Sequence, residues 1–147
     1  MADHYPEASI RHWLDGKTLH QASRYDNAIC HYAFSVECAV KAFRDQFLQV
    51  YKGKDDKTHN AEPVWESLTA YQELLGILNP QLSLLIGIGA PPPLLFDGHP
   101  VRRYYNDSSY TADDLAECGE FVDRLIQQII FAAMDGKLPY KSERGVQ

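Results

Sequence analysis

Apolar residues recur every three or four positions over residues 26–50, which predicts a long α-helix early in the chain. One helical face carries Ile29, Ala33, Val36, Val40, Phe43, Phe47 and Val50. A second, shorter row follows another side of the helix and consists of Cys30, Phe34 and Cys38. A helix that is apolar on two sides is packed on two sides, so we expect this segment at the centre of a helical bundle.

The ends of this helix are also marked in the sequence. Asp26 stands where an N-cap is expected, because its carboxylate can accept from the free N–H groups of the first turn. Lys52-Gly53-Lys54 is the expected stop, with a glycine and with cations at the negative end of the helix dipole.

Three further segments have helical spacing. Residues 6–22 form an amphipathic pattern, and residues 61–78 repeat apolar positions at intervals of four and three until Asn79-Pro80. The last helix is predicted from Thr111, which caps it, to Gly136, which ends it.

Residues 81–100 are apolar but rich in Gly and Pro, which predicts a short helical turn or short extra helix followed by an ordered loop. Such a loop must be covered, either by the end of the bundle or by a second subunit, and we prefer the second. The expected fold is all-α: one domain over residues 1–147, built as an antiparallel four-helix bundle, with a loosely ordered tail over residues 137–147.

Composition narrows the class of protein. The chain is 45% hydrophobic and 23% charged, as in ordinary globular proteins, and its net charge is −6. An acidic chain binds nucleic acid only through a local basic patch. No signal peptide and no membrane span are expected, and the three cysteines are expected to be buried thiols in a reducing compartment, which favours a cytoplasmic protein.

A family resemblance lies in the central helix. The run Tyr32-Ala33-Phe34-Ser35-Val36-Glu37-Cys38-Ala39-Val40-Lys41-Ala42 resembles the second helix of HEPN domains (higher eukaryotes and prokaryotes nucleotide-binding). Weaker similarity continues in Lys57-Thr58-His59-Asn60 and in Arg103-Tyr104-Tyr105. The resemblance implies a homodimeric helical bundle in an RNA- or nucleotide-linked stress or defence function. It also implies a toxin–antitoxin type of module, with a nucleotidyltransferase as the partner protein.

HEPN ribonucleases use an arginine followed by a histidine four to six residues later. Histidine can deprotonate the ribose 2′-hydroxyl and arginine can stabilise charge on the phosphate, so no metal is needed. Arg24 and His31, with six residues between them, are the pair that fits this spacing. They depart from the family pattern because Tyr25 follows the arginine and because the pair lies at the start of the second helix. A metal-independent endoribonuclease is therefore an alternative to binding alone.

Other residues are candidates for binding a nucleotide or RNA. Glu37 and Lys41 are four apart on the central helix and can form a local ion pair, either exposed or, because this helix is packed on two sides, partly buried in the bundle. His59 lies near two lysines, and Arg102 and Arg103 precede Tyr104, which is chemistry suited to holding a phosphate and stacking a base.

The remaining histidines, His4, His12, His20 and His99, have no ligand spacing with acids or cysteines, so neither a metal nor a cofactor is expected. A third hypothesis is a non-catalytic interaction module that docks a partner protein through residues 82–96.

Overall fold

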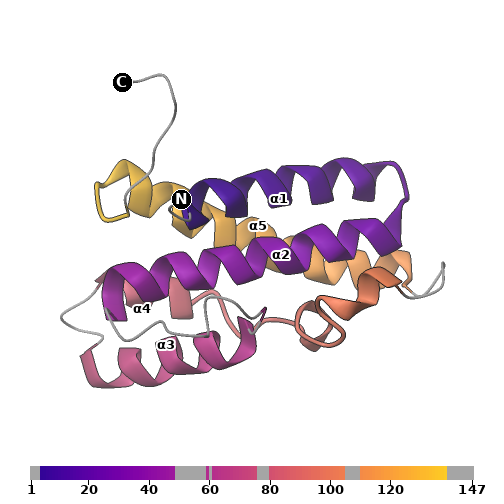
Figure 1. The fold of residues 1–147 in the computed structure, drawn as a ribbon. Coiled ribbons are helices and arrows are strands. Elements are labelled where there is room, and N and C mark those ends of the chain that lie inside the picture. Colours follow the sequence, from indigo (N-terminus) through magenta and orange to yellow (C-terminus); the bar gives the residue numbers. More distant parts are fainter. Residues whose placement is uncertain (1–3, 49–58, 60, 76–79, 105–109, 139–147) are drawn as a thin grey trace.

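The computed structural model describes residues 4–48, 59, 61–75, 80–104 and 110–138 of the chain. The α-helices in these ranges are α1 (Tyr5–Gln21), α2 (Tyr25–Phe43), α3 (Ala61–Leu75), α4 (Pro80–Ile86) and α5 (Ala112–Met134) (Figure 1). Shorter elements are the π-helix η1 (Arg44–Leu48) and the 3-10 helices η4 (Pro93–Leu95) and η5 (Val101–Tyr104). These ranges contain no strand, so the predicted all-α class is confirmed.

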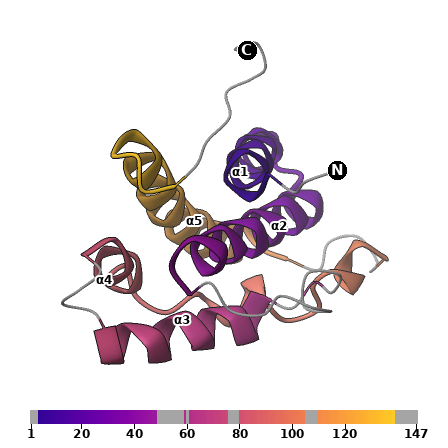
Figure 2. The ribbon, with the colours of Figure 1, turned by 60° about the vertical axis from the view of Figure 1, so that its left-hand side comes forward.

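Helix α2 is covered on two sides, as its two apolar rows predict. Helices α1 and α5 pack on one side of it and α3 on the other (Figure 2). Of its 19 residues, 12 are buried, and two of these, Glu37 and Lys41, are charged. The centre of the fold therefore contains an ion pair as well as an apolar core.

The contacts between helices give their directions. In α1 and α2, Ser35 donates from Oγ to the carbonyl of Ser9 at 2.8 Å, and the turn between the helices lies at residues 22–24, so the two helices are antiparallel. Helix α3 follows the same direction as α2 in Figure 1, and its start lies beside the middle of α2, where His59 meets Glu37. The strict alternation of directions in the predicted bundle is therefore not met at α3. Residues 49–60 separate η1 from α3, and a segment of that length is long enough to return along α2.

The observed ends of α2 differ from the prediction. The helix begins at Tyr25 with Arg24 at the N-cap position and no side-chain cap, so Asp26 lies in the first turn instead of capping it. The reason is the tight connection from α1, in which Ser23 adopts a φ of 60° and the chain re-enters a helix at once. After Phe43 the chain continues as the π-helix η1, and Val50 and Lys52-Gly53-Lys54 lie outside the described residues.

The start of the last helix is as predicted. The Oγ1 of Thr111 accepts from the backbone N–H of Asp114 at 3.2 Å, and the Asp114 carboxylate accepts from the backbone N–H of Thr111 at 3.0 Å. This reciprocal arrangement is a capping box. At the other end Gly136 has a φ of 72°, which suits the residue after a helix.

The Gly- and Pro-rich segment after α3 forms α4, η4 and η5, and it covers the chain's own core. Leu82, Leu85 and Leu95 are fully buried among side chains of the main hydrophobic cluster. The chain's own bundle therefore covers these three leucines, and cover of the rest of the segment by a second subunit stays a prediction. Leu84, by contrast, is 58% exposed.

The remaining general expectations are met in part. Cys118 is buried, whereas Cys30 and Cys38 are half-buried, and within the described part of the chain none of the three is joined in a disulfide. Among the described helices, each is too short or too polar to cross a lipid bilayer. The tail beyond residue 138 lies outside the described residues.

Candidate functional site

Glu37 and Lys41 lie one turn apart in the buried middle of α2. Lys41 donates from Nζ to Oε2 of Glu37 at 2.9 Å, and the two side chains are 1% and 7% exposed. An ion pair at such depth is compensated only when the remaining polar atoms also have partners. Glu37 has further partners, which meet at its other carboxylate oxygen, Oε1.

Two histidines from distant parts of the chain reach that second oxygen. His59, just before α3, places Nδ1 3.0 Å from Oε1 of Glu37, and His99, in the loop after η4, places Nε2 2.9 Å from the same atom. The His99 side chain is only 2% exposed, whereas that of His59 is 45% exposed. The carboxylate thus holds one buried and one solvent-facing imidazole.

These contacts keep Glu37 ionised. Burial by itself raises the pKa of Glu37, but hydrogen bonds from His99, Lys41 and His59, together with the charge of Lys41, lower that pKa to about 2. Glu37 is therefore a permanent anion at neutral pH. It can orient the two imidazoles by accepting from one nitrogen of each.

A second pair of histidines lies nearby on α1 and α2. The Nδ1 atoms of His12 and His31 are 3.1 Å apart, so one of them donates and the other accepts. Burial, and then the charges of His31 and Arg11, lower the pKa of His12. Phe34 lies between the two groups, with its ring centroid 5.3 Å from that of His12 and 4.4 Å from that of His99.

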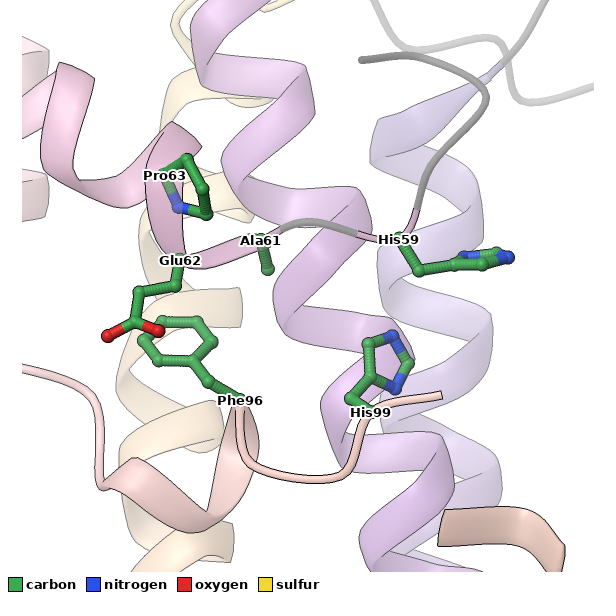
Figure 3. A pocket seen from close by; sticks show the side chains of 6 residues that line it. All are labelled: His59, Ala61, Glu62, Pro63, Phe96 and His99. Carbon is green, nitrogen blue, oxygen red and sulfur yellow. The ribbon is translucent and has the colours of Figure 1, made fainter. Parts of the chain in front are cut away.

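A pocket of about 220 Å³ opens beside His59 and His99. Its wall comes from two segments: the start of α3 with Ala61, Glu62 and Pro63, and the loop that carries Phe96. Figure 3 shows these two segments in front of α2, with His99 and Phe96 on the lower one. The pocket therefore offers an aromatic ring, an apolar rim and two imidazoles to a ligand.

The structure brings together some of the predicted binding residues. Glu37, Lys41 and His59 meet as described. Arg102 does not join them, because it is 3% exposed, donates from a guanidinium nitrogen to the carbonyl of Asp97, and lies 5.7 Å from the centre of the Tyr110 ring. It binds the loop together, and its side chain is not free to hold a phosphate. The side chains of Arg103 and Tyr104 lie outside the described part of the chain.

The predicted catalytic pair is placed on one helix. Arg24 is exposed at the start of α2, and His31 is half-buried about two turns further on, against His12. The structure thus gives His31 a histidine neighbour instead of the arginine that the sequence suggested.

Sequence reasoning missed His99 and His12. For His12 a partial signal was available: it stands ten residues before the turn at residues 22–24 and His31 seven residues after it, so an antiparallel helix pair places the two within about one helical turn of each other. His99 gave no such signal, because its position depends on the path of the loop after α4. The three ligand atoms that Glu37, His59 and His99 offer all lie within 4.8 Å of one another.

Comparisons with protein-family models, with curated proteins and with solved structures find no match for this chain. The function is therefore argued from the side chains that meet at Glu37.

Proposed function

We propose that this chain is a HEPN-like bundle of α1, α2, α3 and α5 that binds the nucleotide units of RNA beside His59 and His99. The ligand class follows from the resemblance of residues 32–42 to a HEPN helix. The place follows from the pocket and from the side chains around it. By the same resemblance, the protein acts as a homodimer in a stress or defence module with a nucleotidyltransferase partner.

The observation that carries the proposal is that one buried carboxylate holds both histidines at the wall of a pocket. A protonated imidazole is both a cation and a hydrogen-bond donor, which suits it to a phosphate oxygen. His59 is held through Nδ1, so Nε2 lies on the opposite edge of a ring that is 45% exposed. It is the side chain best placed to reach a ligand from solution.

The size and lining of the pocket favour a single unit of a polymer over a whole enclosed nucleotide. Its volume of about 220 Å³ is below the range of about 300–1,000 Å³ that is common for small-molecule sites. Phe96 supplies a ring face on which one base can stack, as bases do on aromatic residues in single-stranded RNA complexes. The rest of the strand would then lie across the protein surface.

The test is RNA binding by fluorescence anisotropy, with a short labelled single strand, at low salt and in the presence of EDTA. His59→Ala removes the exposed imidazole and leaves the ion pair of Glu37 and Lys41 in place. We expect about tenfold weaker binding, which corresponds to the loss of a charge-assisted hydrogen bond. His4→Ala, at an exposed position before α1, is the matched control and should bind as the unsubstituted protein does. Equal affinity of His59→Ala would overturn the proposal.

A metal-independent endoribonuclease is the second candidate, and the pairing of His12 with His31 is the observation that favours it. The Nδ1 atoms of the two imidazoles are 3.1 Å apart, so one of these nitrogens is unprotonated and accepts from the other, and an unprotonated imidazole nitrogen is the form that a general base needs. This candidate predicts cleavage of RNA in EDTA and its loss in His31→Ala. Cleavage that persists in His31→Ala would exclude a role for this pair, and a chain that neither binds nor cleaves RNA would fit the interaction module instead.

A further inference from the structure

Three donor atoms from three separate segments converge at one point beside the pocket. They are Oε1 of Glu37 on α2, Nδ1 of His59 before α3, and Nε2 of His99 after η4, and all lie within 4.8 Å of one another. The carboxylate oxygen is 3.0 Å from the His59 nitrogen and 2.9 Å from the His99 nitrogen. The two rings therefore direct their nitrogen atoms at the same oxygen.

Lys41 holds one oxygen of the Glu37 carboxylate. Its ammonium group donates to Oε2 at 2.9 Å, on a side chain that is 1% exposed. Oε1 faces both histidines, and Nδ1 of His59 lies 3.0 Å from Oε1 and 3.1 Å from Oε2. Hydrogen bonding to the far oxygen of a ligating carboxylate is what the surroundings of metal sites commonly provide, because it fixes the orientation of the ligand.

His99 is the buried imidazole of this cluster. Its side chain is 2% exposed, and its Nε2 lies 2.9 Å from Oε1 of Glu37. Among the described residues its other ring nitrogen, Nδ1, has no hydrogen-bond partner. The hydrogen bonding that orients this ring is thus through Nε2, the atom that would bind an ion.

We propose that Glu37, His59 and His99 bind one divalent transition-metal ion of the zinc type, through Oε1, Nδ1 and Nε2. Two imidazoles and one carboxylate are a donor set that such ions accept, with a fourth position left open. The open position faces solvent and the 220 Å³ pocket, since His59 and His99 both line its wall. This inference departs from the sequence-based expectation of no metal site and does not depend on RNA binding.

The two distances to Oε1 need little change. Bonds of about 2.0–2.1 Å in a tetrahedral site put neighbouring donor atoms roughly 3.3 Å apart. The histidine nitrogens now lie 3.0 and 2.9 Å from Oε1, so each must withdraw by a few tenths of an ångström. Each nitrogen also gives up its proton as the ion enters, and His59, at the solvent-facing edge, provides the route of entry.

The test measures metal binding to the full chain without nucleic acid. The protein is stripped with a chelator and dialysed, then titrated with Zn²⁺ by calorimetry and with Co²⁺ by its visible absorption. We expect one equivalent of either ion, a four-coordinate Co²⁺ spectrum, and a Zn²⁺-dependent rise in the unfolding temperature. His59→Ala should weaken Zn²⁺ binding by roughly a hundredfold and abolish that spectrum.

Two variants make the result specific. His4→Ala removes an exposed histidine before α1 and should bind Zn²⁺ as the unsubstituted chain does, because His4 is not among the three ligands. His59→Ala changes a side chain that is 45% exposed, so it should remain folded, which circular dichroism checks. Unchanged Zn²⁺ affinity in His59→Ala, no saturable binding, or loss of binding in His4→Ala would each overturn the proposal. Because RNA binding is measured in EDTA, failure of one proposal leaves the other intact.

Discussion

The Nε2 atom of His99 lies 2.9 Å from Oε1 of Glu37, although 62 residues separate the two along the chain. This contact joins the loop after η4 to the middle of α2, and His59 joins the segment before α3 to the same oxygen. Three parts of the chain are therefore held at one buried carboxylate. Glu37 is expected to matter for the stability of the fold as much as for any ligand.

The first prediction is that Glu37→Gln strongly destabilises the protein. The amide keeps the size of the side chain but removes its charge, which takes the anionic partner from Lys41, a cation that is 1% exposed. Removing one partner of a buried ion pair costs about 3–5 kcal/mol of unfolding free energy. Urea unfolding at neutral pH measures it, and Glu62→Gln, at an exposed position on α3, is the control. A loss below about 1 kcal/mol would contradict the assigned role of Glu37.

Local patterns predicted the helices well because their information lies within a few residues. The spacing of Ile29, Val36 and Phe43 indicated a helix packed on two sides, and Thr111 indicated the start of α5. The spacing of Glu37 and Lys41 likewise indicated an ion pair, and the structure shows that this pair is buried. The direction of α3 was not predictable in this way, because it depends on the path taken between η1 and α3.

The candidate site was only half predictable. Glu37, Lys41 and His59 were singled out, but their meeting with His99 depends on how residues 87–100 cross the bundle, and no periodicity encodes that path. Arg102 looked like a phosphate ligand beside aromatic residues, yet it is buried and donates to the carbonyl of Asp97. Spacing in a sequence does not distinguish a cation that binds a ligand from one that holds a loop.

The second prediction concerns the dependence of stability on pH. Burial and the charges of His31 and Arg11 place the pKa of His12 below its usual value of 6.5 in the folded protein. The unfolded chain therefore binds more protons as the pH falls below about 6.5, and folded stability drops as the pH falls through the lowered pKa. Between pH 7.5 and 5.5, His12→Gln should lose less unfolding free energy than the unsubstituted chain.

The control for this pH effect is His4→Gln, which changes an exposed histidine that directly precedes α1. Its unfolding free energy should follow that of the unsubstituted chain at every pH. If the unfolding free energy of His12→Gln has the same pH dependence as that of the unsubstituted protein, burial and the contact with His31 do not disfavour protonation of His12.

The third prediction is that Gly16→Ala destabilises α1, although alanine is the better helix former. A Cβ at Gly16 would lie 2.6 Å from Cδ1 and 2.7 Å from Cε1 of Tyr32. Tyr32 is fully buried and its hydroxyl is 2.9 Å from Nδ1 of His20, so the ring has little room to withdraw. The gain in helix propensity, about 1 kcal/mol, is outweighed by overpacking of about 1–3 kcal/mol.

Thermal unfolding measures this effect, and Asp15→Ala serves as the matched control, because Asp15 is the exposed neighbour of Gly16 on the same helix. We expect Asp15→Ala to change the unfolding free energy by less than about 0.5 kcal/mol. A higher unfolding temperature for Gly16→Ala would show that the contact between α1 and Tyr32 is looser than the distances indicate.

The fourth prediction tests whether the Gly- and Pro-rich segment is covered by the chain's own bundle or by a second subunit. Leu95 is fully buried in the chain's own core, whereas Leu84 is 58% exposed on α4. Leu95→Asp places a charge in that core and should cost more than about 4 kcal/mol of unfolding free energy, which lowers the unfolding temperature strongly. Leu84→Asp should leave the unfolding temperature unchanged. Light scattering measures the mass of Leu84→Asp in solution and so tests the subunit contact. If the protein is a dimer joined through α4, Leu84→Asp should dissociate it into folded monomers. A dimer that survives this change must be joined elsewhere.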